Sequence, residues 1–374
     1  MVSDEFSFIQ QYFARMEHAA YGHNGAQGKV VLGIGDDAAI IPMQGNYAIT
    51  TDTLVENVHF FTNFNPKLLG ARALEVNFSD VYAMGALPQY LTLSLDIPER
   101  YLDFDEFWQP FAQGVEECLA RHNCYLIGGN VTRSNNRNAP LTISATAFGQ
   151  NVDNQRNLRR SGAKVGDFIY VTGSLGANGL YVKTVYNNTL RNLDLEERRH
   201  FEEHAFHYDE RIAAFIVHVI KYSQCGIDVS DGLLGDLSHI LMQSHCCALL
   251  NYESLPLDEV SRELLPHFKV SPKSLLKLGL SAGGDYNLIF TVPANRQTEF
   301  EAEIAADPAL QGFLCTCIGQ VVASDDPNFD WEHNALATDG GLITIVNHQG
   351  EPTTLRLGVG SYNHFLSNSS LAGQ

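Results

Sequence analysis

Four aspartates in the sequence stand at positions where an acid is not expected without a role. Asp52 interrupts the apolar, β-branched run Tyr47–Val55, where a buried carboxylate is unfavourable unless it is paired or bound to a metal. Asp80 lies beside the apolar stripe of a predicted helix, a position that an ordinary helix-border acid also occupies. Asp228 ends a predicted strand, and Asp231 opens the helix that follows. Because Mg²⁺ accepts carboxylates together with water and substrate phosphates, these acids predict a magnesium site.

The segment around Asp231 also has a simpler interpretation. Ser230 or Asp231 is a good N-cap for the apolar helix that begins after Gly232. A helix N-terminus attracts phosphate as well, because its first backbone N–H groups have no partners within the helix. The capping and the phosphate-binding interpretations are therefore compatible.

Short motifs narrow the chemistry further. Gly33–Ala38 fits the pattern G-x-G-x-x-A of dinucleotide-binding turns. Asp36 and Asp37 would place negative charge against a pyrophosphate, however, and a strand rather than a helix is predicted next, so an acidic surface turn is the alternative. The sequence contains no P-loop motif G-x-x-x-x-G-K-[ST] and no H-R-D or D-F-G motif of protein kinases.

Composition excludes several classes of protein. The 374 residues carry a formal net charge of -19, with 45% hydrophobic and 18% charged residues, which is typical of a globular chain long enough for two domains. The acidic balance disfavours nucleic acid and anionic lipid as partners, and it requires cations wherever a phosphate ester binds. We expect no membrane span, since no run approaches ~18 apolar residues, and no secretion signal. The seven cysteines lack C-x-x-C spacing, which suits reduced thiols in a cytoplasmic protein.

Hydrophobic periodicity predicts strands mixed with helices rather than a strict alternation of the two. Asn65 and Pro66 begin a predicted helix that stops near Gly85. Period-two alternation, typical of half-buried strands, marks Leu91–Leu95 and Leu141–Ala147. Other predicted strands are Val30–Ile34, Tyr47–Val55, Asp167–Thr172, Tyr286–Val292 and Phe313–Val322, and other predicted helices are Phe6–Met16, Phe104–His122, the charged region Asp194–Val217 and a helix after Ser230. The mixture predicts an α+β or mixed α/β fold.

We expect two domains joined by a short linker. Residues 1–150 form the predicted N-terminal α/β domain, and residues 165–366 form the C-terminal one. The polar, basic segment 151–164 lacks periodicity and is the predicted linker, and residues 367–374 are a predicted terminal tail.

A series of motifs runs in order along nearly the whole chain: GIGDDAA (33–39), TDTLVENVHF (51–60), NFSDVYAMGALP (77–88), RSGAKVGD (160–167), IDVSDGLLGDLSHI (227–240), SAGGDYNLIF (281–290), CIGQ (317–320) and YNHF (362–365). In this order the motifs resemble those of thiamine-monophosphate kinases. The wider superfamily includes aminoimidazole ribonucleotide synthetase, selenophosphate synthetase and the hydrogenase-maturation dehydratase. The last two rely on a cysteine close to a terminus, and no cysteine precedes Cys118 or follows Cys317.

The resemblance implies a two-domain aminoimidazole ribonucleotide synthetase-like fold, with the N-terminal sheet at a homodimer interface. It implies ATP and several Mg²⁺ ions between the domains, and thiamine monophosphate as the phosphoryl acceptor. Position by position, it implies metal ligands at Asp37, Thr50, Thr51, Asp52, Asp80, Asn130, Asp228 and Asp231. It implies ATP contacts at Gly129, Asn130, Arg160 and Ser230, and thiamine-phosphate contacts at His59, Gly284 and Tyr362.

The implied reaction depends on charge rather than on a general base. A phosphate monoester has a second pKa of about 6, so the acceptor oxygen is largely ionised at neutral pH. Direct in-line transfer then requires the repulsion between two anions to be neutralised, by metal ions and by Arg160.

The chain departs from the family pattern at two motifs. The pattern GGDT is replaced by Gly128–Val131, so Asn130 stands where a magnesium-binding carboxylate is expected. The pattern GEDYE is replaced by Gly283–Asn287, with Gly284 and Asn287 in place of acids. Three functions therefore stay open: an active kinase with an altered metal site, a weakened relative that senses nucleotide or thiamine phosphate, and another ATP-using synthetase of the superfamily.

Overall fold

The computed structural model describes residues 5–20, 29–102, 104–136, 138–329, 342–347 and 349–351. It divides into two compact units, Met1–Asn157 (unit 1) and Leu158–Gln374 (unit 2). The boundary lies inside the segment 151–164 that the sequence marks as a linker. The second half of that segment packs into unit 2, where Leu158 and Ala163 are buried and the Arg159 N–H donates to the Gln224 carbonyl oxygen at 3.0 Å.

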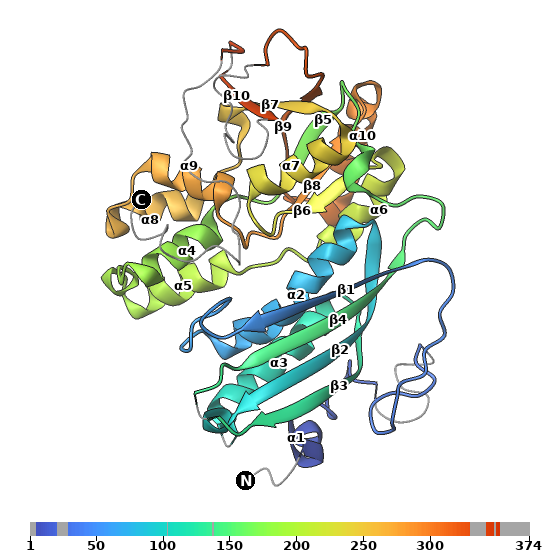
Figure 1. Ribbon diagram of the computed structural model, residues 1–374, viewed down its shortest axis with the longest axis vertical. Coiled ribbons are helices and arrows are strands. Elements are labelled where there is room, and N and C mark those ends of the chain that lie inside the picture. The colour runs from blue at the N-terminus through green and yellow to red at the C-terminus, as the bar shows by residue number, and fades with distance from the viewer. Residues whose placement is uncertain are drawn as a thin grey trace. The chain divides into compact units, whose positions relative to one another are not determined.

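Unit 1 is built on a four-stranded sheet in the order β1-β4-β2-β3 (Figure 1). The strands are β1 (Tyr47–Val55), β2 (Ala86–Pro98), β3 (Tyr125–Ser134) and β4 (Thr142–Asn151). β4 pairs antiparallel with both β1 and β2, whereas β2 and β3 run parallel. Asp52 of β1 lies opposite Ala145, Ala145 lies opposite Leu93, and Leu93 lies opposite Gly129 of β3. One row of residues therefore crosses the sheet from one edge strand to the other.

Two helices, α2 (Pro66–Ala83) and α3 (Asp105–Arg121), lie along one face of this sheet, and α1 (Glu5–Tyr12) packs beside α3 and β3 (Figure 1). Asn65 caps α2, because its Oδ1 accepts hydrogen bonds from the Lys67 and Leu68 N–H groups at 3.0 and 3.4 Å. The core between helices and sheet contains the fully buried rings of Phe78, Trp108 and Phe111.

The opposite face of this sheet, called the open face below, carries hydroxyl side chains. Thr51 and Thr146 share a hydrogen bond of 2.8 Å between their hydroxyl oxygens, and Thr53 and Ser144 do the same at 2.8 Å. Side chains of a strand alternate between faces, so the neighbours of these residues along β1 point toward α2. Ile49, on the open face of β1, is 58% exposed.

Unit 2 is built on a six-stranded sheet in the order β10-β7-β9-β5-β8-β6. The strands are β5 (Phe168–Thr172), β6 (Gly226–Asp228), β7 (Cys247–Asn251), β8 (Leu288–Val292), β9 (Cys315–Val322) and β10 (Ile343–Val346). β10 runs parallel to β7, and the other neighbouring pairs are antiparallel. The neighbouring strands β5, β8 and β6 are short and nearly all their residues are buried, which is typical of a sheet covered on both faces.

Helices cover both faces of the unit 2 sheet. The helices of this unit are α4 (Ala177–Tyr186), α5 (Leu195–Ala205), α6 (Ile212–Tyr222), α7 (Leu233–Ser244), α8 (Glu259–Phe268), α9 (Pro272–Ser281) and α10 (Gln297–Ala306). Leu237 of α7 and Leu280 of α9 join the core on one face. On the other face, Phe215 of α6 and Phe300 of α10 pack edge-on against Phe290 of β8.

Most of the predicted elements are present, and the mixed α/β class is confirmed. The predicted strand Val30–Ile34 is wrong, because this segment forms only isolated bridges, with Leu32 opposite Ile40. Its backbone is used locally instead: the Ile34 N–H donates to the Ala20 carbonyl oxygen at 2.6 Å. The first helix ends at Tyr12 rather than Met16, and the charged region Asp194–Val217 forms parts of two helices, α5 and α6. In the part of the chain that the structure describes, no helix combines the length and the apolar character needed to cross a membrane.

Candidate active site

Asp52 on β1 and Asp80 on α2 are brought together in unit 1. The Thr50 hydroxyl donates to Asp80 Oδ2 at 2.6 Å. Asn77, one turn before Asp80, is fully buried: its Oδ1 accepts from the Asp52 N–H at 3.0 Å, and its Nδ2 donates to the Ala73 carbonyl oxygen at 3.2 Å. These bonds fix β1 against α2 at the position of the two acids.

The charge of one acid affects the other. Burial, then the negative charge of Asp80 and a hydrogen bond with it, raise the pKa of Asp52 to about 6. A cation bound between the two groups would favour the ionised form of Asp52 and displace its proton. Two carboxylates that repel each other are hard oxygen ligands of the kind that Mg²⁺ prefers, so this pair fits the predicted metal role.

Thr51 does not share this environment. Its side chain points to the open face, where its hydroxyl is bonded to Thr146, whereas Thr50 and Asp52 point toward α2. Only the backbone of Thr51 is near the acid pair, so any role as a ligand of the same ion would fall to its carbonyl oxygen.

Gly129 and Asn130 lie at the far edge of the sheet, on β3. A Cβ added to Gly129 would lie 1.8 Å from the Leu93 carbonyl oxygen, so a glycine is required here by the close approach of β2. Asn130 pairs with Ser94 and is exposed on the open face. Three strand spacings, about 14 Å, separate β3 from β1, so within one chain Asn130 does not join Asp52.

Asp37 lies in an exposed turn, where its N–H donates to Asp36 Oδ1 at 2.9 Å. The described residues contain one group of three or more His, Cys, Asp or Glu side chains whose ligand atoms lie within 4.8 Å of one another, and it consists of Glu75, Cys118 and His122. Asp37 therefore forms no such cluster with Asp52 and Asp80 in this structure.

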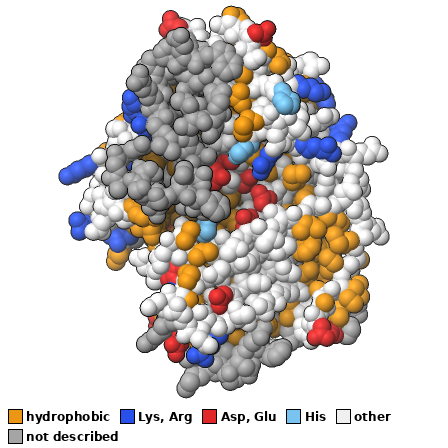
Figure 2. Space-filling model, in the orientation of Figure 1, with side chains coloured by type: hydrophobic (Ala, Val, Ile, Leu, Met, Phe, Trp, Pro, Cys, Tyr) orange, Lys and Arg blue, Asp and Glu red, His pale blue; other side chains and the backbone are white. Residues whose placement is uncertain are grey.

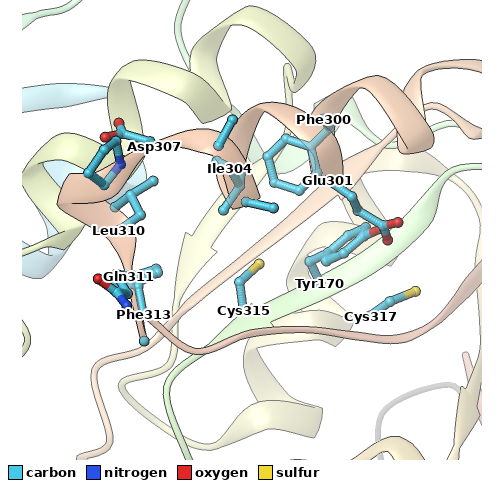
Figure 3. A pocket seen from close by; sticks show the side chains of 14 residues that line it. Tyr170, Phe300, Glu301, Ile304, Asp307, Leu310, Gln311, Phe313, Cys315 and Cys317 are labelled. Carbon is cyan, nitrogen blue, oxygen red and sulfur yellow. The ribbon is translucent and has the colours of Figure 1, made fainter.

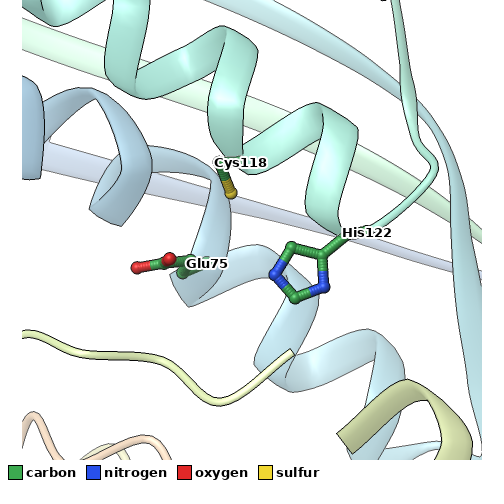
Figure 4. Close-up of side chains that lie close together, drawn as sticks. All are labelled: Glu75, Cys118 and His122. Atoms are coloured by element: carbon green, nitrogen blue, oxygen red, sulfur yellow. The ribbon is translucent and has the colours of Figure 1, made fainter. Parts of the chain in front are cut away.

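The group of Glu75, Cys118 and His122 lies between α2 and α3 (Figure 4). Glu75 Oε1 is 2.8 Å from Arg121 Nη2, so the guanidinium already supplies positive charge there. Burial, with the charge of Arg121, lowers the pKa of His122 to about 3, and the neutral ring is hydrogen-bonded to the Tyr82 hydroxyl at 2.8 Å. We interpret this group as polar packing between two helices.

His59, the predicted thiamine-phosphate contact, is exposed in the turn after β1. Its Nδ1 accepts a hydrogen bond from the Val55 N–H at 3.0 Å, which leaves the proton of the neutral ring on Nε2. The adjacent Glu56 is buried and holds the turn in place by accepting from the Leu141 N–H at 2.9 Å and from Arg100. Burial alone would raise the pKa of Glu56, but these bonds and the charge of Arg100 keep it below its usual value.

The second group of predicted residues surrounds the loop between β6 and α7 in unit 2. Asp228 is buried at the end of β6, and Ser230 and Asp231 follow it in the loop. Asp236, in the first turn of α7, accepts hydrogen bonds on Oδ2 from the Asp231 and Gly232 N–H groups at 3.0 and 3.1 Å. Burial raises the pKa of Asp236 to about 7, although the two N–H groups favour its charged form.

The loop 282–287, which contains the second departure from the family pattern, is bonded to the β6–α7 loop. The Gly284 N–H donates to the Ser230 carbonyl oxygen at 2.9 Å, and the Tyr286 N–H donates to the Val229 carbonyl oxygen at 2.8 Å. Asn287 donates from Nδ2 to the Ser174 carbonyl oxygen at 2.7 Å, a bond that a carboxylate there could not make. This hydrogen bond is a structural reason for an amide rather than a carboxylate at position 287.

Arg160 and Tyr362 complete the predicted set. The Arg160 side chain is exposed, and its carbonyl oxygen accepts from the Ser244 hydroxyl at 2.9 Å, which holds the segment on unit 2. Tyr362 lies outside the residues that the structure describes, as does the predicted tail.

Unit 2 also contains a cavity of about 700 Å³ between α10 and β9 (Figure 3). Tyr170, Phe300, Glu301, Cys315 and Cys317 are among its lining residues. The Tyr170 hydroxyl donates to Glu301 Oε1 at 2.6 Å, and burial raises the pKa of both thiols, which keeps them protonated. None of the predicted site residues lines this cavity.

Sequence reasoning missed the residues that hold the predicted ligands in place. Asn77 and Asp236 lie inside motifs that were identified, each on the buried side of a helix. The signal that was available was their spacing: Asn77 is one helical turn from Asp80, and Asp236 is in the first turn after Asp231 and Gly232.

Comparisons with known proteins show the family and the fold to which the chain is similar. Residues 35–151 match the family model described as AIR synthase related protein, N-terminal domain. The chain is 37% identical over 353 residues to the thiamine-monophosphate kinase of Escherichia coli (strain K12), an alignment that covers 92% of this chain and 97% of that protein. The crystal structure of thiamine-monophosphate kinase from Stenotrophomonas maltophilia K279a aligns with a TM-score of 0.71 and 29% identity, covering 88% of this chain and 93% of that chain.

A further solved structure, AaThiL complexed with AMPPCP and TMP, aligns with a TM-score of 0.66, covering 96% of this chain and 97% of that chain. Its sequence identity is 24%, so the likeness is one of fold. The predicted aminoimidazole ribonucleotide synthetase-like fold is confirmed by these matches.

Proposed function

The chain belongs to the thiamine-monophosphate kinase family, and we propose that it transfers the γ-phosphoryl group of ATP directly to the phosphate of thiamine monophosphate, forming thiamine diphosphate and ADP. Identity over nearly the full length of the Escherichia coli relative supports this activity, as does the complex of a structural neighbour with AMPPCP and TMP. The observation in this chain that carries the proposal is the Asp52–Asp80 pair, with the raised pKa of Asp52.

Several Mg²⁺ ions are part of the proposal. Asp52 and Asp80 would hold metal in unit 1, and Asp228 and Asp231 would hold metal in unit 2. Bound Mg²⁺ would neutralise charge on the phosphates of ATP and of the acceptor. The donor set fits, because carboxylate oxygens are the usual protein ligands of Mg²⁺.

The chain's own residues then need only bind and orient two phosphorylated substrates. The acceptor oxygen is already ionised at neutral pH, since its second pKa is about 6, and so no side chain has to remove a proton. Ser230 and Arg160 would contact ATP, the Gly129 backbone would approach the nucleotide closely, and His59 would contact the acceptor. In-line attack of the acceptor phosphate on the γ-phosphorus breaks the bond to the β–γ bridging oxygen, and ADP leaves with that oxygen.

We propose that the active form is a homodimer formed through the unit 1 sheet. Asp52 and Asn130 lie on opposite edge strands about 14 Å apart, and edge strands readily pair with another chain. If β3 of a second copy lay beside β1, the partner's asparagine at this position would approach the edge that carries the acid pair. Figure 2 shows hydrophobic side chains gathered at the lower right of the view, where Figure 1 draws unit 1. The exposed apolar residues of unit 1 include Ile40, Met43 and Ile49.

The sensor alternative rests on Asn130 and Gly284, and the structure gives a local reason for the second residue but not for the first. Gly284 and Asn287 are built into local packing and hydrogen bonding, so their presence does not indicate an eroded site. Asn130 has no such local explanation. We therefore favour an active kinase with one weaker metal position, acting in the cytoplasm, where its seven free thiols would stay reduced.

The test is the reaction itself. Purified protein is incubated with γ-labelled ATP, Mg²⁺ and either thiamine monophosphate or thiamine, and the products are separated by chromatography. We expect label in thiamine diphosphate and none in a product of thiamine. Binding of both substrates without transfer would support the sensor, and label transferred to thiamine would contradict a phosphate acceptor.

A further inference from the structure

Gly284, a predicted acceptor contact without a side chain, has an unusual environment. Its φ of +96° is a conformation that residues with side chains rarely adopt. A Cβ added there would lie 2.4 Å from Asn178 Oδ1 and 2.8 Å from Asn178 Cγ. The Asn178 side chain therefore fills the space that a side chain at position 284 would need.

Asn178 itself is a buried polar residue with an unmet donor. It is the second residue of α4, and it is 6% exposed. Its Nδ2 is buried and has no hydrogen-bond partner in the part of the chain that the structure describes. Native proteins seldom retain such a donor, because the loss of hydration is not compensated, so an unpartnered amide beside a candidate site indicates a ligand.

The surroundings of Asn178 connect it to the predicted substrate loops. At the start of α4, the Gly176 N–H donates to Asp285 Oδ2 at 2.9 Å. The Gly284 N–H donates to the Ser230 carbonyl oxygen at 2.9 Å. The Asn178 amide thus lies against a loop that is hydrogen-bonded to the loop predicted to bind ATP.

We propose that Asn178 binds the phosphoryl acceptor in place of a side chain at residue 284; the inference rests on the proposed function. Its Nδ2 donates a hydrogen bond to an oxygen or ring-nitrogen acceptor of thiamine monophosphate. A carboxylate at residue 284 would instead add negative charge and accept hydrogen bonds. Nδ2 is buried in this structure, so contact with the acceptor molecule requires the Gly284 loop, which lies against the amide, to move. Asn178 is then a specificity-determining residue that makes this part of the site neutral and donating.

The first test compares two substitutions with a matched control. Asn178→Ala removes the amide, and Asn178→Asp keeps its shape but loses the donor. Each is expected to raise the KM for thiamine monophosphate about five- to tenfold, the equivalent of one neutral hydrogen bond, with kcat within about twofold and the KM for ATP unchanged. Asn187→Ala, at the exposed C-cap of the same helix, should change none of these.

The second test measures coupling between residues 178 and 284. Gly284→Ala is made in the wild-type chain and in the Asn178→Ala chain, and melting temperature and KM are compared. The positive φ opposes alanine in both backgrounds, so only the contact with Asn178 differs between them. We expect the substitution to lower the melting temperature more in the wild-type chain. Equal effects in both backgrounds would contradict the claim that Asn178 fills this space.

Binding of thiamine monophosphate, measured by calorimetry on the same proteins, separates the two proposals. If the wild type binds the acceptor but does not phosphorylate it, the kinase proposal fails. The Kd values of the wild type and the Asn178 variants for thiamine monophosphate then still test the role of Asn178. An unchanged Kd and KM in the Asn178→Asp protein would overturn the inference while leaving the kinase proposal intact. Absence of both binding and turnover in the wild type would overturn both.

Discussion

The two units use acidic residues in opposite ways. In unit 1, Asp52 and Asp80 face each other from a strand and a helix, and burial together with the charge of Asp80 raises the pKa of Asp52 to about 6. In unit 2, Asp236 points its carboxylate at two backbone N–H groups and holds the loop in front of α7. Burial disfavours the charged form of both, since the pKa of Asp236 is also raised, to about 7. The difference lies in what faces each carboxylate: like charge in the first arrangement, which a cation would offset, and backbone N–H donors in the second. Acids inside otherwise apolar segments therefore divide into candidate ligands and supports according to what faces them.

The largest effect is expected from removing one charge of the Asp52–Asp80 pair in unit 1. Asp52→Asn and Asp80→Asn should each lower kcat for thiamine diphosphate formation at least a hundredfold, because magnesium would lose an ionic ligand. Melting curves without Mg²⁺ should show equal or higher stability, since the repulsion is gone. Asp325→Asn, at an exposed loop acid, is the matched control and should behave as wild type.

The pH dependence of that stability difference follows from the sign of the pKa shift. The folded-state pKa of Asp52 is raised from 3.8 to about 6, so the metal-free wild type loses stability from this group as the pH rises from about 3.8 to 6. Asp52→Asn should therefore be more stable than wild type at pH 8 and close to it at pH 4. Near-normal turnover in both Asp52→Asn and Asp80→Asn would contradict the proposal that these two residues bind magnesium.

Asp236→Ala should have the reverse effect on stability. It leaves the Asp231 and Gly232 N–H groups without their acceptor, which should lower the free energy of unfolding by about 1 to 3 kcal/mol. Activity should fall mainly through a raised KM for ATP, because the loop that carries Ser230 is loosened. A melting temperature at or above that of wild type would show that Asp236 is not a support. Asp236→Asn, which keeps one acceptor oxygen, should be milder than Asp236→Ala.

A smaller effect is expected at His59, which contributes binding rather than charge neutralisation. His59→Asn should raise the KM for thiamine monophosphate more than it lowers kcat, as expected for a contact made before and during transfer. Steady-state kinetics with the acceptor varied at saturating ATP would measure this. A large loss of kcat with an unchanged KM would place His59 in the chemical step.

The smallest effect should come from Asn130→Asp, at the edge of the sheet opposite the acid pair. An added carboxylate should lower the Mg²⁺ concentration for half-maximal activity by roughly two- to fivefold, since an ion–ion attraction replaces an ion–dipole contact. The effect should depend on dimer formation, which sedimentation at the assay concentration would check. An unchanged Mg²⁺ dependence in a dimeric protein would exclude residue 130 as a ligand.

The sequence was most informative where a residue broke a pattern. Asp52 was identified because it interrupts an apolar strand, and β1 spans the predicted range Tyr47–Val55. Asn65 and Pro66 gave the start of α2 because capping is a local property of the chain. Asp80 could be placed only beside the apolar stripe of that helix, and the structure supplied its contact with Thr50.

Features that depend on distant contacts could not be predicted in the same way. Val30–Ile34 has strand-like residues, but its partners are Ala20 and Ile40 rather than a sheet. Gly284 stands where the family pattern has an acid, and the space of its missing side chain is filled by Asn178, more than a hundred residues away in the chain. The positions of Thr51 and Asn130 on the open face follow from sheet register, which a single sequence does not give.

The most direct test of the central claim, that Asp52 and Asp80 bind Mg²⁺ as a pair, is proton release on metal binding. Mg²⁺ is titrated calorimetrically into the wild type and into Asp52→Asn at pH 6 and pH 8, in two buffers that differ in ionisation enthalpy. With a pKa of about 6, Asp52 is about half protonated at pH 6. At pH 6 the wild type should therefore release about half a proton more than Asp52→Asn when Mg²⁺ binds, and at pH 8 the two proteins should release equal numbers of protons. Equal proton release by the two proteins at pH 6 would contradict the claim.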